Sequence, residues 1–205
     1  MENKLSPDSA LIVVDYQNDF VSPRWALYVK WAETISQSIS SLIAIFGLQG
    51  LKLIATKDWH PQNHISFASS HRLKPFESKN WNMLWPDHCI ANLRWSQLFW
   101  LSDEIFHKII LKWYETDKDA YSGFKWTDLK EYLGQDWIKK LYLCGVATDY
   151  CVRESALDSI KLWYKTYLFT DAVKAVAQTS ENAVLKDLQE IWVNLIDFDY
   201  LKKIV

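Results

Sequence analysis

Short apolar runs alternate with amphipathic segments along most of this chain. The runs are rich in β-branched residues, which is typical of strands buried on both faces of a parallel sheet. The expected strands cover residues 10–15, 51–56, 108–112, 140–146, 164–170 and 193–197. Apolar positions at helical spacing, with capping or stop residues at the ends, predict helices over residues 32–50, 127–133, 149–162 and 180–191.

This alternation predicts an α/β fold: a three-layer sandwich in which helices flank a central, mostly parallel, six-stranded sheet. The chain shows no internal repeat, low-complexity segment or linker, so residues 1–205 are expected to form a single domain. Residues 57–95 break the pattern, because they are polar and aromatic with little periodicity. We interpret residues 57–95 as an insertion that binds a metal ion and the substrate.

Three reactive side chains follow predicted strands, at the edge where parallel sheets bind ligands. Asp15 and Lys112 each end a strand, and Cys151 lies early in the helix that follows residues 140–146. That position is expected to lower the pKa of the Cys151 thiol, and a nearby lysine ammonium would stabilise the thiolate. Asp15 could take the thiol proton as a general base, so the set suits nucleophilic acyl transfer. Cys144 lies inside a strand, where we expect it only to pack.

A second cluster suits a metal ion. Asp58 and His60 are two residues apart, and His88 follows in the same irregular segment. One carboxylate and two imidazoles match zinc, iron or manganese and leave positions open for water. One divalent ion is expected, with zinc as the first choice and iron or manganese as alternatives. His64 is either a fourth ligand or a group that supports the ligands.

Composition and charge narrow the classes of function. The chain has 23 basic and 25 acidic residues and a net charge of −2, so no nucleic-acid partner is expected. No stretch resembles a signal peptide or a membrane span, so no membrane partner is expected. Three cysteines cannot all pair, and we expect a cytoplasmic protein without a disulfide framework. The expected partner is a small-molecule substrate, and homo-oligomer formation is left open.

Five motifs, in order along the chain, resemble those of the nicotinamidases in the isochorismatase-like superfamily of cysteine hydrolases. They are ALIVVDYQNDF, TKDWHPQNHISFAS, LWPDHC, DAYSGF and LYLCGVATDYCV, and the similarity runs from about residue 10 to residue 197. The resemblance implies the isochorismatase-like hydrolase fold. It also implies hydrolysis of nicotinamide to nicotinate and ammonia through a cysteine thioester, which would serve NAD salvage.

The resemblance further implies roles for individual residues. The catalytic triad would be Asp15, Lys112 and Cys151, and the metal ligands would be Asp58, His60 and His88. Only some family members use a second nearby histidine, so His64 stays unassigned. The walls of the pyridine pocket would be Phe20, Trp85 and Tyr121. A cis peptide between Val146 and Ala147 would aim the N–H groups of Ala147 and Cys151 into an oxyanion hole, and the metal would bind the pyridine nitrogen and hold water.

Three other functions remain as alternatives. One is a related amidase that acts on a carbamoyl or ureido substrate, or an isochorismatase. A second is a non-catalytic homologue that keeps the pocket as a binding module. A third is a structural metal protein with an idle thiol. The apparent metal cluster argues against the first, and the complete set of reactive side chains argues against the second.

Tryptophan and glycine occur in unusual numbers, because the chain has 12 Trp and only 5 Gly, whereas glycine is usually about 7% of residues. Eight tryptophans stand where turn patterns or the family favour glycine: Trp25, Trp31, Trp95, Trp113, Trp126, Trp137, Trp163 and Trp192. Trp163 follows a predicted helix, where a left-handed glycine is common. We hypothesise that these codons are UGA, decoded as glycine in the source organism but rendered as tryptophan here. The alternative is a diverged, aromatic-rich homologue.

Overall fold

The computed structural model describes residues 5–25, 27–80 and 82–204, and a six-stranded parallel sheet forms the centre of this part of the chain. The strand order is β5-β2-β1-β6-β7-β8, and every neighbouring pair is parallel. The strands are β1 (Ser9–Val14), β2 (Lys52–Asp58), β5 (Lys108–Lys112), β6 (Lys140–Val146), β7 (Lys165–Lys174) and β8 (Asn194–Ile196). All six correspond to predicted strands, so the predicted fold class is confirmed.

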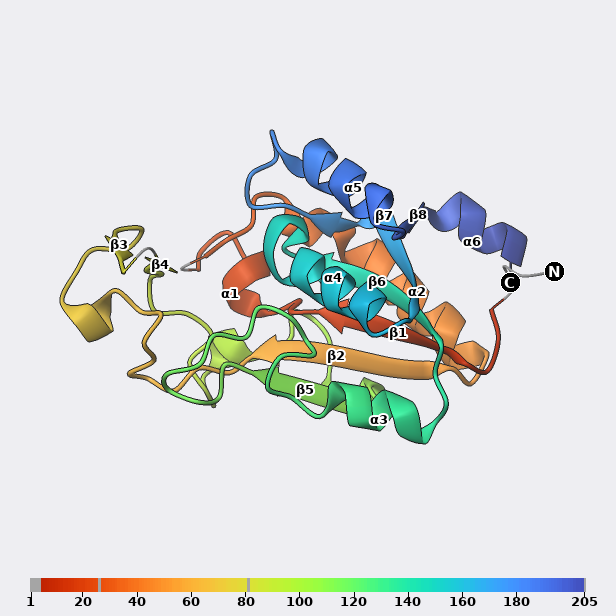
Figure 1. Ribbon diagram of the computed structural model, residues 1–205, viewed down its shortest axis with the longest axis horizontal. Helices are drawn as coiled ribbons and strands as arrows, with labels where there is room; N and C mark the ends of the chain where they lie inside the picture. The colour runs from red at the N-terminus through yellow and green to blue at the C-terminus, as the bar shows by residue number, and fades with distance from the viewer. Residues whose placement is uncertain (1–4, 26, 81, 205) are drawn as a thin grey trace.

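Helices cover both faces of the sheet (Figure 1). Helices α2 (Ser36–Leu48) and α6 (Phe198–Ile204) pack on one face. Helices α3 (Leu129–Gln135), α4 (Arg153–Lys161) and α5 (Glu181–Glu190) pack on the other. The helix predicted over residues 32–50 begins as a 3₁₀ turn, Ala32–Ile35, before α2.

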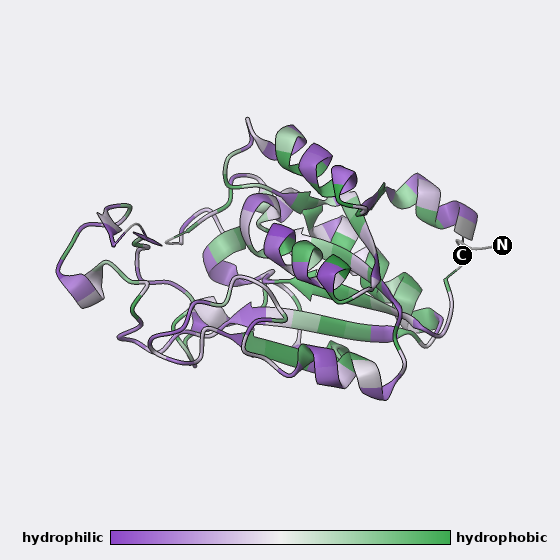
Figure 2. Ribbon diagram, viewed as in Figure 1, coloured by the Kyte–Doolittle hydropathy of each residue, from purple (hydrophilic) through white to green (hydrophobic). Residues whose placement is uncertain are grey.

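Alternate residues of the strands enter two separate cores. In β1, Leu11 and Val13 face α2, whereas Ile12 and Val14 face α3 and α4. Both side-chain sets are buried, which explains why the strands read as continuous apolar runs. Figure 2 shows apolar residues through the middle of β2 and a hydrophilic segment at the carboxyl end of that strand, which belongs to the site.

The parallel strands all run toward one end of the molecule, and the carboxyl ends of β2 and β5 lie there (Figure 1, left), where long connections gather. The longest connection joins β2 to β5 and contains a two-stranded hairpin, β3 (Ser78–Lys79) and β4 (Asn82–Met83). Among the described helices, none has the length and apolar character that crossing a bilayer requires. The candidate site therefore lies at the carboxyl ends of the strands, where the long polar connection between β2 and β5 covers the edge of the sheet.

Several short elements were not predicted. Helix α1 (Asn18–Val21) and helix α6 are examples. Cys151 lies in a π-helical turn, Thr148–Val152, that precedes α4, and not within the first turn of a regular α-helix.

Candidate active site

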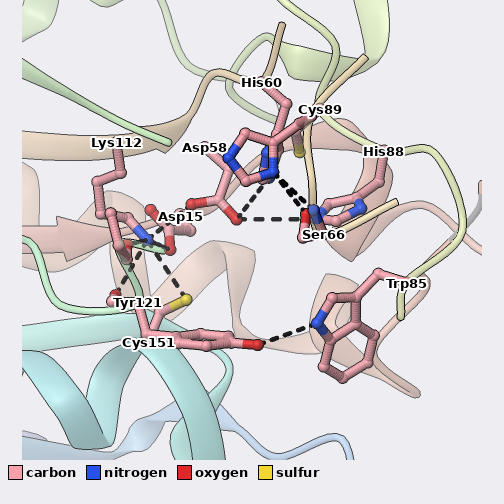
Figure 3. Close-up of polar contacts among 12 residues, drawn as sticks. Asp15, Asp58, His60, Ser66, Trp85, His88, Cys89, Lys112, Tyr121 and Cys151 are labelled. Carbon is pink, nitrogen blue, oxygen red and sulfur yellow. Dashed lines mark hydrogen bonds and ion pairs between the residues drawn. The ribbon is translucent and has the colours of Figure 1, made fainter. Parts of the chain in front are cut away.

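The three reactive side chains meet at the carboxyl ends of β1, β5 and β6 (Figure 3). Lys112 Nζ lies 2.8 Å from Asp15 Oδ2 and 3.4 Å from Cys151 Sγ. All three residues are buried, and Lys112 is fully inaccessible to solvent. The predicted spatial convergence of these three strand ends is therefore present in the structure.

Lys112 also contacts a member of the second cluster. Its ammonium lies 2.7 Å from Asp58 Oδ1, and it donates hydrogen bonds to the carbonyl oxygens of Ala120 and Tyr121 at 3.2 and 3.0 Å. Burial opposes the charged form of Lys112, but the carboxylates of Asp15 and Asp58 outweigh burial and raise its pKa. The lysine thus carries a positive charge at neutral pH and joins the two clusters.

The two carboxyl groups beside Lys112 respond in opposite directions. Complete burial raises the pKa of Asp15 to about 6, although Lys112 counteracts part of the effect. Burial by itself would also raise the pKa of Asp58. Lys112 and the neighbouring His60 and His88 outweigh burial and lower this pKa below the usual range. Asp58 is therefore a permanent anion, whereas Asp15 can exchange a proton near neutral pH.

The thiol of Cys151 does not have the lowered pKa that its place near a helix start predicted. Burial raises the pKa of Cys151 well above its ordinary value, and the attraction of Lys112 offsets only part of that effect. The carboxylate of Asp15 accepts a hydrogen bond from the thiol and favours the protonated form as well. The expectation of a lowered pKa for this thiol was wrong, because burial removes water from the sulfur. A base must remove the proton.

Backbone geometry explains how Asp15 reaches this point. Its φ of 44° turns the chain sharply after β1, and Thr56 in β2 donates a hydrogen bond to Asp15 Oδ1 at 2.5 Å. Beside it, Gly145 has a φ of 113°, and a Cβ there would lie 2.1 Å from the Val14 carbonyl oxygen. Only glycine allows β6 to approach β1 so closely just before the turn that leads to Cys151.

Asp58, His60 and His88 form a compact ligand set. One ligand atom from each lies within 4.8 Å of the others, and all three residues are buried. His60 Nε2 is 3.9 Å and His88 Nε2 is 4.0 Å from Asp58 Oδ2, which leaves room for an ion between them. His88 Nδ1 donates to the Pro86 carbonyl oxygen at 2.8 Å, so its Nε2 faces the site as an acceptor.

His60 supplies the test of whether a metal fits. Neither of its ring nitrogens has a hydrogen-bond partner within the described part of the chain, although the ring is buried. Burial lowers its pKa to about 3, so the ring is neutral and can donate a lone pair. Buried imidazoles rarely lack partners, and a divalent cation would satisfy this one. The residues fit the ion.

His64 lies outside the ligand set. Its Nδ1 accepts a hydrogen bond from the Ser66 N–H at 3.0 Å, and its Nε2 donates to the Lys118 carbonyl oxygen at 3.2 Å. Its ring packs against His60 with centroids 4.7 Å apart. Both nitrogens are therefore committed to the protein, and His64 supports the orientation of His60.

A cavity of about 210 Å³ opens beside both clusters. Its polar floor includes Asp58, His60, His88 and Cys151. The predicted aromatic walls all line it: Phe20, Trp85 and Tyr121. Trp85 Nε1 donates to the Tyr121 hydroxyl at 2.9 Å, which fixes these two rings relative to each other. Ala147 also lines the cavity, next to the cis peptide that joins it to Val146.

The sequence reasoning missed several residues that position this site. Gln17 is fully buried, and its side chain accepts from Asp58 N–H at 2.7 Å and donates to Asp58 O at 2.8 Å. Asp19 Oδ2 accepts from Cys89 N–H at 2.6 Å, beside His88. Both lie in the motif DYQNDF after β1, so their place next to Asp15 was the available signal. Tyr150 and Trp113, which also line the cavity, were not assigned to it.

Comparison with known proteins agrees with this architecture. Residues 9–199 match the isochorismatase domain family. The nicotinamidase of Saccharomyces cerevisiae is 34% identical over 212 residues, covering 91% of this chain and 98% of the relative. The nicotinamidase of Escherichia coli is 35% identical over 181 residues, covering 83% and 84%. A pyrazinamidase of Pyrococcus horikoshii, solved in complex with zinc, has a TM-score of 0.84 and 38% identity, covering 94% of this chain and 100% of that one.

The fold and the site thus define a three-layer α/β domain with a buried thiol beside a set of side chains that could hold a metal ion. The chain belongs to the isochorismatase domain family, and the predicted family resemblance is confirmed.

Proposed function

We propose that this chain hydrolyses nicotinamide to nicotinate and ammonia, with Cys151 as the nucleophile. One observation carries the proposal: Cys151 and the Asp58, His60 and His88 set line one aromatic cavity, and Lys112, buried behind its wall, contacts Cys151, Asp15 and Asp58. The relatives that are similar over most of the chain are named nicotinamidases, which supports the same substrate.

In the first half of the reaction, Asp15 takes the proton of the Cys151 thiol as the sulfur attacks the carboxamide carbon. Lys112 stabilises the developing thiolate, because its ammonium lies 3.4 Å from the sulfur. The N–H groups of Ala147 and Cys151 stabilise the oxyanion, a contribution of about 3–4 kcal/mol in other hydrolases. The C–N bond then breaks, the nitrogen receives the proton held by Asp15, and ammonia leaves behind a thioester.

In the second half, Asp15 accepts a proton from water as the water oxygen attacks the thioester carbon. The carbon–sulfur bond breaks, the sulfur recovers that proton, and nicotinate is released. Asp15 is suited to this exchange because burial raises its pKa to about 6. Lys112 keeps its charge throughout and holds the carboxylate and the sulfur together.

Substrate choice rests on shape and on one polar anchor. Phe20, Trp85 and Tyr121 line a slot that suits a flat aromatic amide. Asp58, His60 and His88 would hold the divalent ion, with zinc as the first choice. When bound, the ion would supply a Lewis acid for the pyridine nitrogen. An aliphatic amide would satisfy neither feature. A role in NAD salvage, a cytoplasmic location and homo-oligomer formation remain predictions.

Ammonia release from nicotinamide, measured with and without a chelator, tests the proposal. We expect turnover by the wild type, loss on chelation, and loss of about 10³-fold or more in Cys151→Ala. The matched control is Cys144→Ala, which removes a buried thiol from β6 and should keep turnover. If the Cys151→Ala variant still binds nicotinate, its pocket is intact and the loss of turnover comes from the missing thiol.

The alternatives give different results in the same assays. Hydrolysis of a ureido or carbamoyl substrate without hydrolysis of nicotinamide would identify a different amidase. Binding of nicotinate by the wild type without any turnover would identify a non-catalytic homologue. Iodoacetamide labelling that is no faster at Cys151 than at the buried Cys89 would point to an idle thiol.

A further inference from the structure

Seven tryptophans adopt the left-handed backbone conformation that favours glycine. Their φ angles are 64° at Trp31, 57° at Trp100, 59° at Trp113, 59° at Trp126, 53° at Trp137, 68° at Trp163 and 78° at Trp192. In this region the Cβ of an L-residue crowds its own backbone, so bulky residues rarely occur there. Six of the seven are among the tryptophans that the sequence pattern marked as glycine positions, and Trp100 is new.

Three of these tryptophans occupy the same place at three helix ends. After α4, Trp163 N–H bonds Ile160 O at 3.0 Å, and Tyr164 N–H bonds Ser159 O at 3.0 Å. This pair of bonds closes a helix around a left-handed residue, which is usually glycine. The equivalent pairs at the other two ends involve Trp137 and Ile138 after α3, and Trp192 and Val193 after α5.

Helix α2 ends in the identical motif and provides an internal reference. There Gly50 N–H bonds Gly47 O at 3.0 Å, and Leu51 N–H bonds Phe46 O at 3.0 Å. The φ of Gly50 is 67°, within the range of the three tryptophans. One helix end of this chain thus shows the residue that the motif prefers, and three show tryptophan in its place.

Nothing in the packing of these rings explains tryptophan at the helix ends. Trp137, Trp163 and Trp192 are 80%, 93% and 84% exposed. By contrast, two tryptophans without a left-handed φ have partners: Trp85 bonds Tyr121, and Trp59 lies under the ammonium of Lys57, 4.6 Å from the ring centroid. At these three helix ends the side chains that cost backbone strain also gain little from burial.

Trp113 is the one buried member, and it lies in the candidate active site. Its ring packs 5.0 Å from His60 and 4.8 Å from Tyr121, as measured between centroids, and it lines the cavity. Its indole Nε1 is buried without a hydrogen-bond partner in the described part of the chain. Buried indole N–H groups usually have partners. Glycine at position 113 would remove the orphan donor and widen the cavity beside the metal ligands.

We propose that positions 31, 100, 113, 126, 137, 163 and 192 carry glycine in the protein that the source organism makes, because UGA codons there are read as glycine. Trp25 and Trp95 are not included. Their φ angles are not left-handed, and their rings contact each other with centroids 5.1 Å apart. For those two positions glycine remains a prediction from the sequence alone.

The codons of the gene give the first test. We expect UGA at all seven positions and UGG at the positions of Trp59 and Trp85. Peptide mass spectrometry of the protein from its own organism should show glycine at the same seven positions. UGG at positions 137, 163 and 192, or tryptophan in those peptides, would overturn the proposal.

Unfolding experiments give a second test, which does not depend on knowing the codons of the source gene. Trp163→Gly should raise the ratio of folded to unfolded protein about fivefold to thirtyfold above Trp163→Ala, because alanine removes the ring but keeps the Cβ. Trp192→Gly and Trp192→Ala should behave in the same way. Trp59→Gly is the control and should lower the ratio. No gain of glycine over alanine at positions 163 and 192 would contradict the inference.

The part that concerns position 113 rests on the proposed function. Trp113→Gly should raise kcat/KM for nicotinamide by about tenfold or more, since it frees space beside His60 and lets the loop after Lys112 relax. An unchanged value would show that residue 113 does not limit the pocket. If no variant hydrolyses nicotinamide, the proposed function fails, whereas the helix-end experiments still decide the identity of the residues.

Discussion

The ammonium of Lys112 lies 2.7 Å from Asp58 Oδ1, so one buried lysine connects the thiol of Cys151 to the proposed metal site. The same ammonium holds Asp15 at 2.8 Å. The carboxylates of Asp15 and Asp58 are both buried next to this one cation. Without the lysine, two buried carboxyl groups would lose the positive charge that compensates them. Lys112 is thus both a catalytic residue, as proposed, and the centre of the buried ionic network.

Replacing Lys112 by methionine should therefore destabilise the fold as well as abolish activity. We expect the free energy of unfolding to fall by about 3–5 kcal/mol, the usual result of leaving a buried charge without its partner. The measurement is urea denaturation. Lys108→Met is the matched control from the same strand, because its partner Asp128 is exposed and Lys108 itself is partly exposed, so the pair should contribute less than about 1 kcal/mol. Equal losses in the two variants would contradict this account.

Activity should decline on the acid side with the titration of Asp15. Burial raises the pKa of Asp15 to about 6, so below that pH the carboxyl is protonated and cannot accept the thiol proton. We expect kcat/KM to fall about tenfold per pH unit below pH 6. Measured metal content at each pH is the control. Since burial lowers the pKa of His60 to about 3, the fall should begin before the ion is lost, and a fall that follows metal loss instead would exclude Asp15 as its cause.

His60→Ala should remove the ion. With one of the three proposed ligands missing, we expect metal affinity to drop more than about 100-fold and turnover to drop with it. Metal content by mass spectrometry and thermal unfolding with added zinc are the measurements. His107→Ala is the control, because that exposed histidine bonds Leu53 N–H at the opposite end of the sheet. Full metal binding in His60→Ala would refute the assignment of this ligand.

Gln17→Leu should weaken the site without touching a ligand side chain. It would leave the buried N–H and carbonyl of Asp58 unpaired, and also the Ser96 carbonyl that Gln17 contacts at 2.8 Å. We expect a loss of at least about 2 kcal/mol in unfolding free energy and about tenfold weaker metal binding. Asn18→Ala, a partly exposed neighbour, is the comparison. Unchanged metal affinity in Gln17→Leu would show that Asp58 holds its position unaided.

The sheet was predictable because the central strands β1, β2 and β6 are buried on both faces and so appear as largely apolar runs, and the partly exposed edge strands β5 and β8 still carry short apolar runs. The residues that end those strands, Asp15 and Lys112, were predictable for the same reason, since a polar residue after such a run marks the sheet edge. Helix α1 and the β3–β4 hairpin were not, because elements of four and two residues leave no periodic signal. The raised pKa of Cys151 depends on burial by distant segments, which local position could not show.

Contacts between segments remote in sequence account for the rest. The bond between Gln17 and Asp58 joins residues 41 apart, and no spacing rule links them. Trp100 was not marked as a glycine position, because no predicted helix ends there; only its φ of 57° and its exposed ring identify it.

If UGA is read as glycine in this gene, the order of the site residues along the chain has a consequence for gene transfer. Of the three proposed catalytic and three proposed ligating side chains, only Asp15 precedes position 31. A cell that uses the standard code would stop at a UGA there and release a peptide with β1 alone, lacking both strands that flank it. Such a recipient would acquire the DNA and gain no enzyme, so the activity would stay confined to lineages that share the altered code.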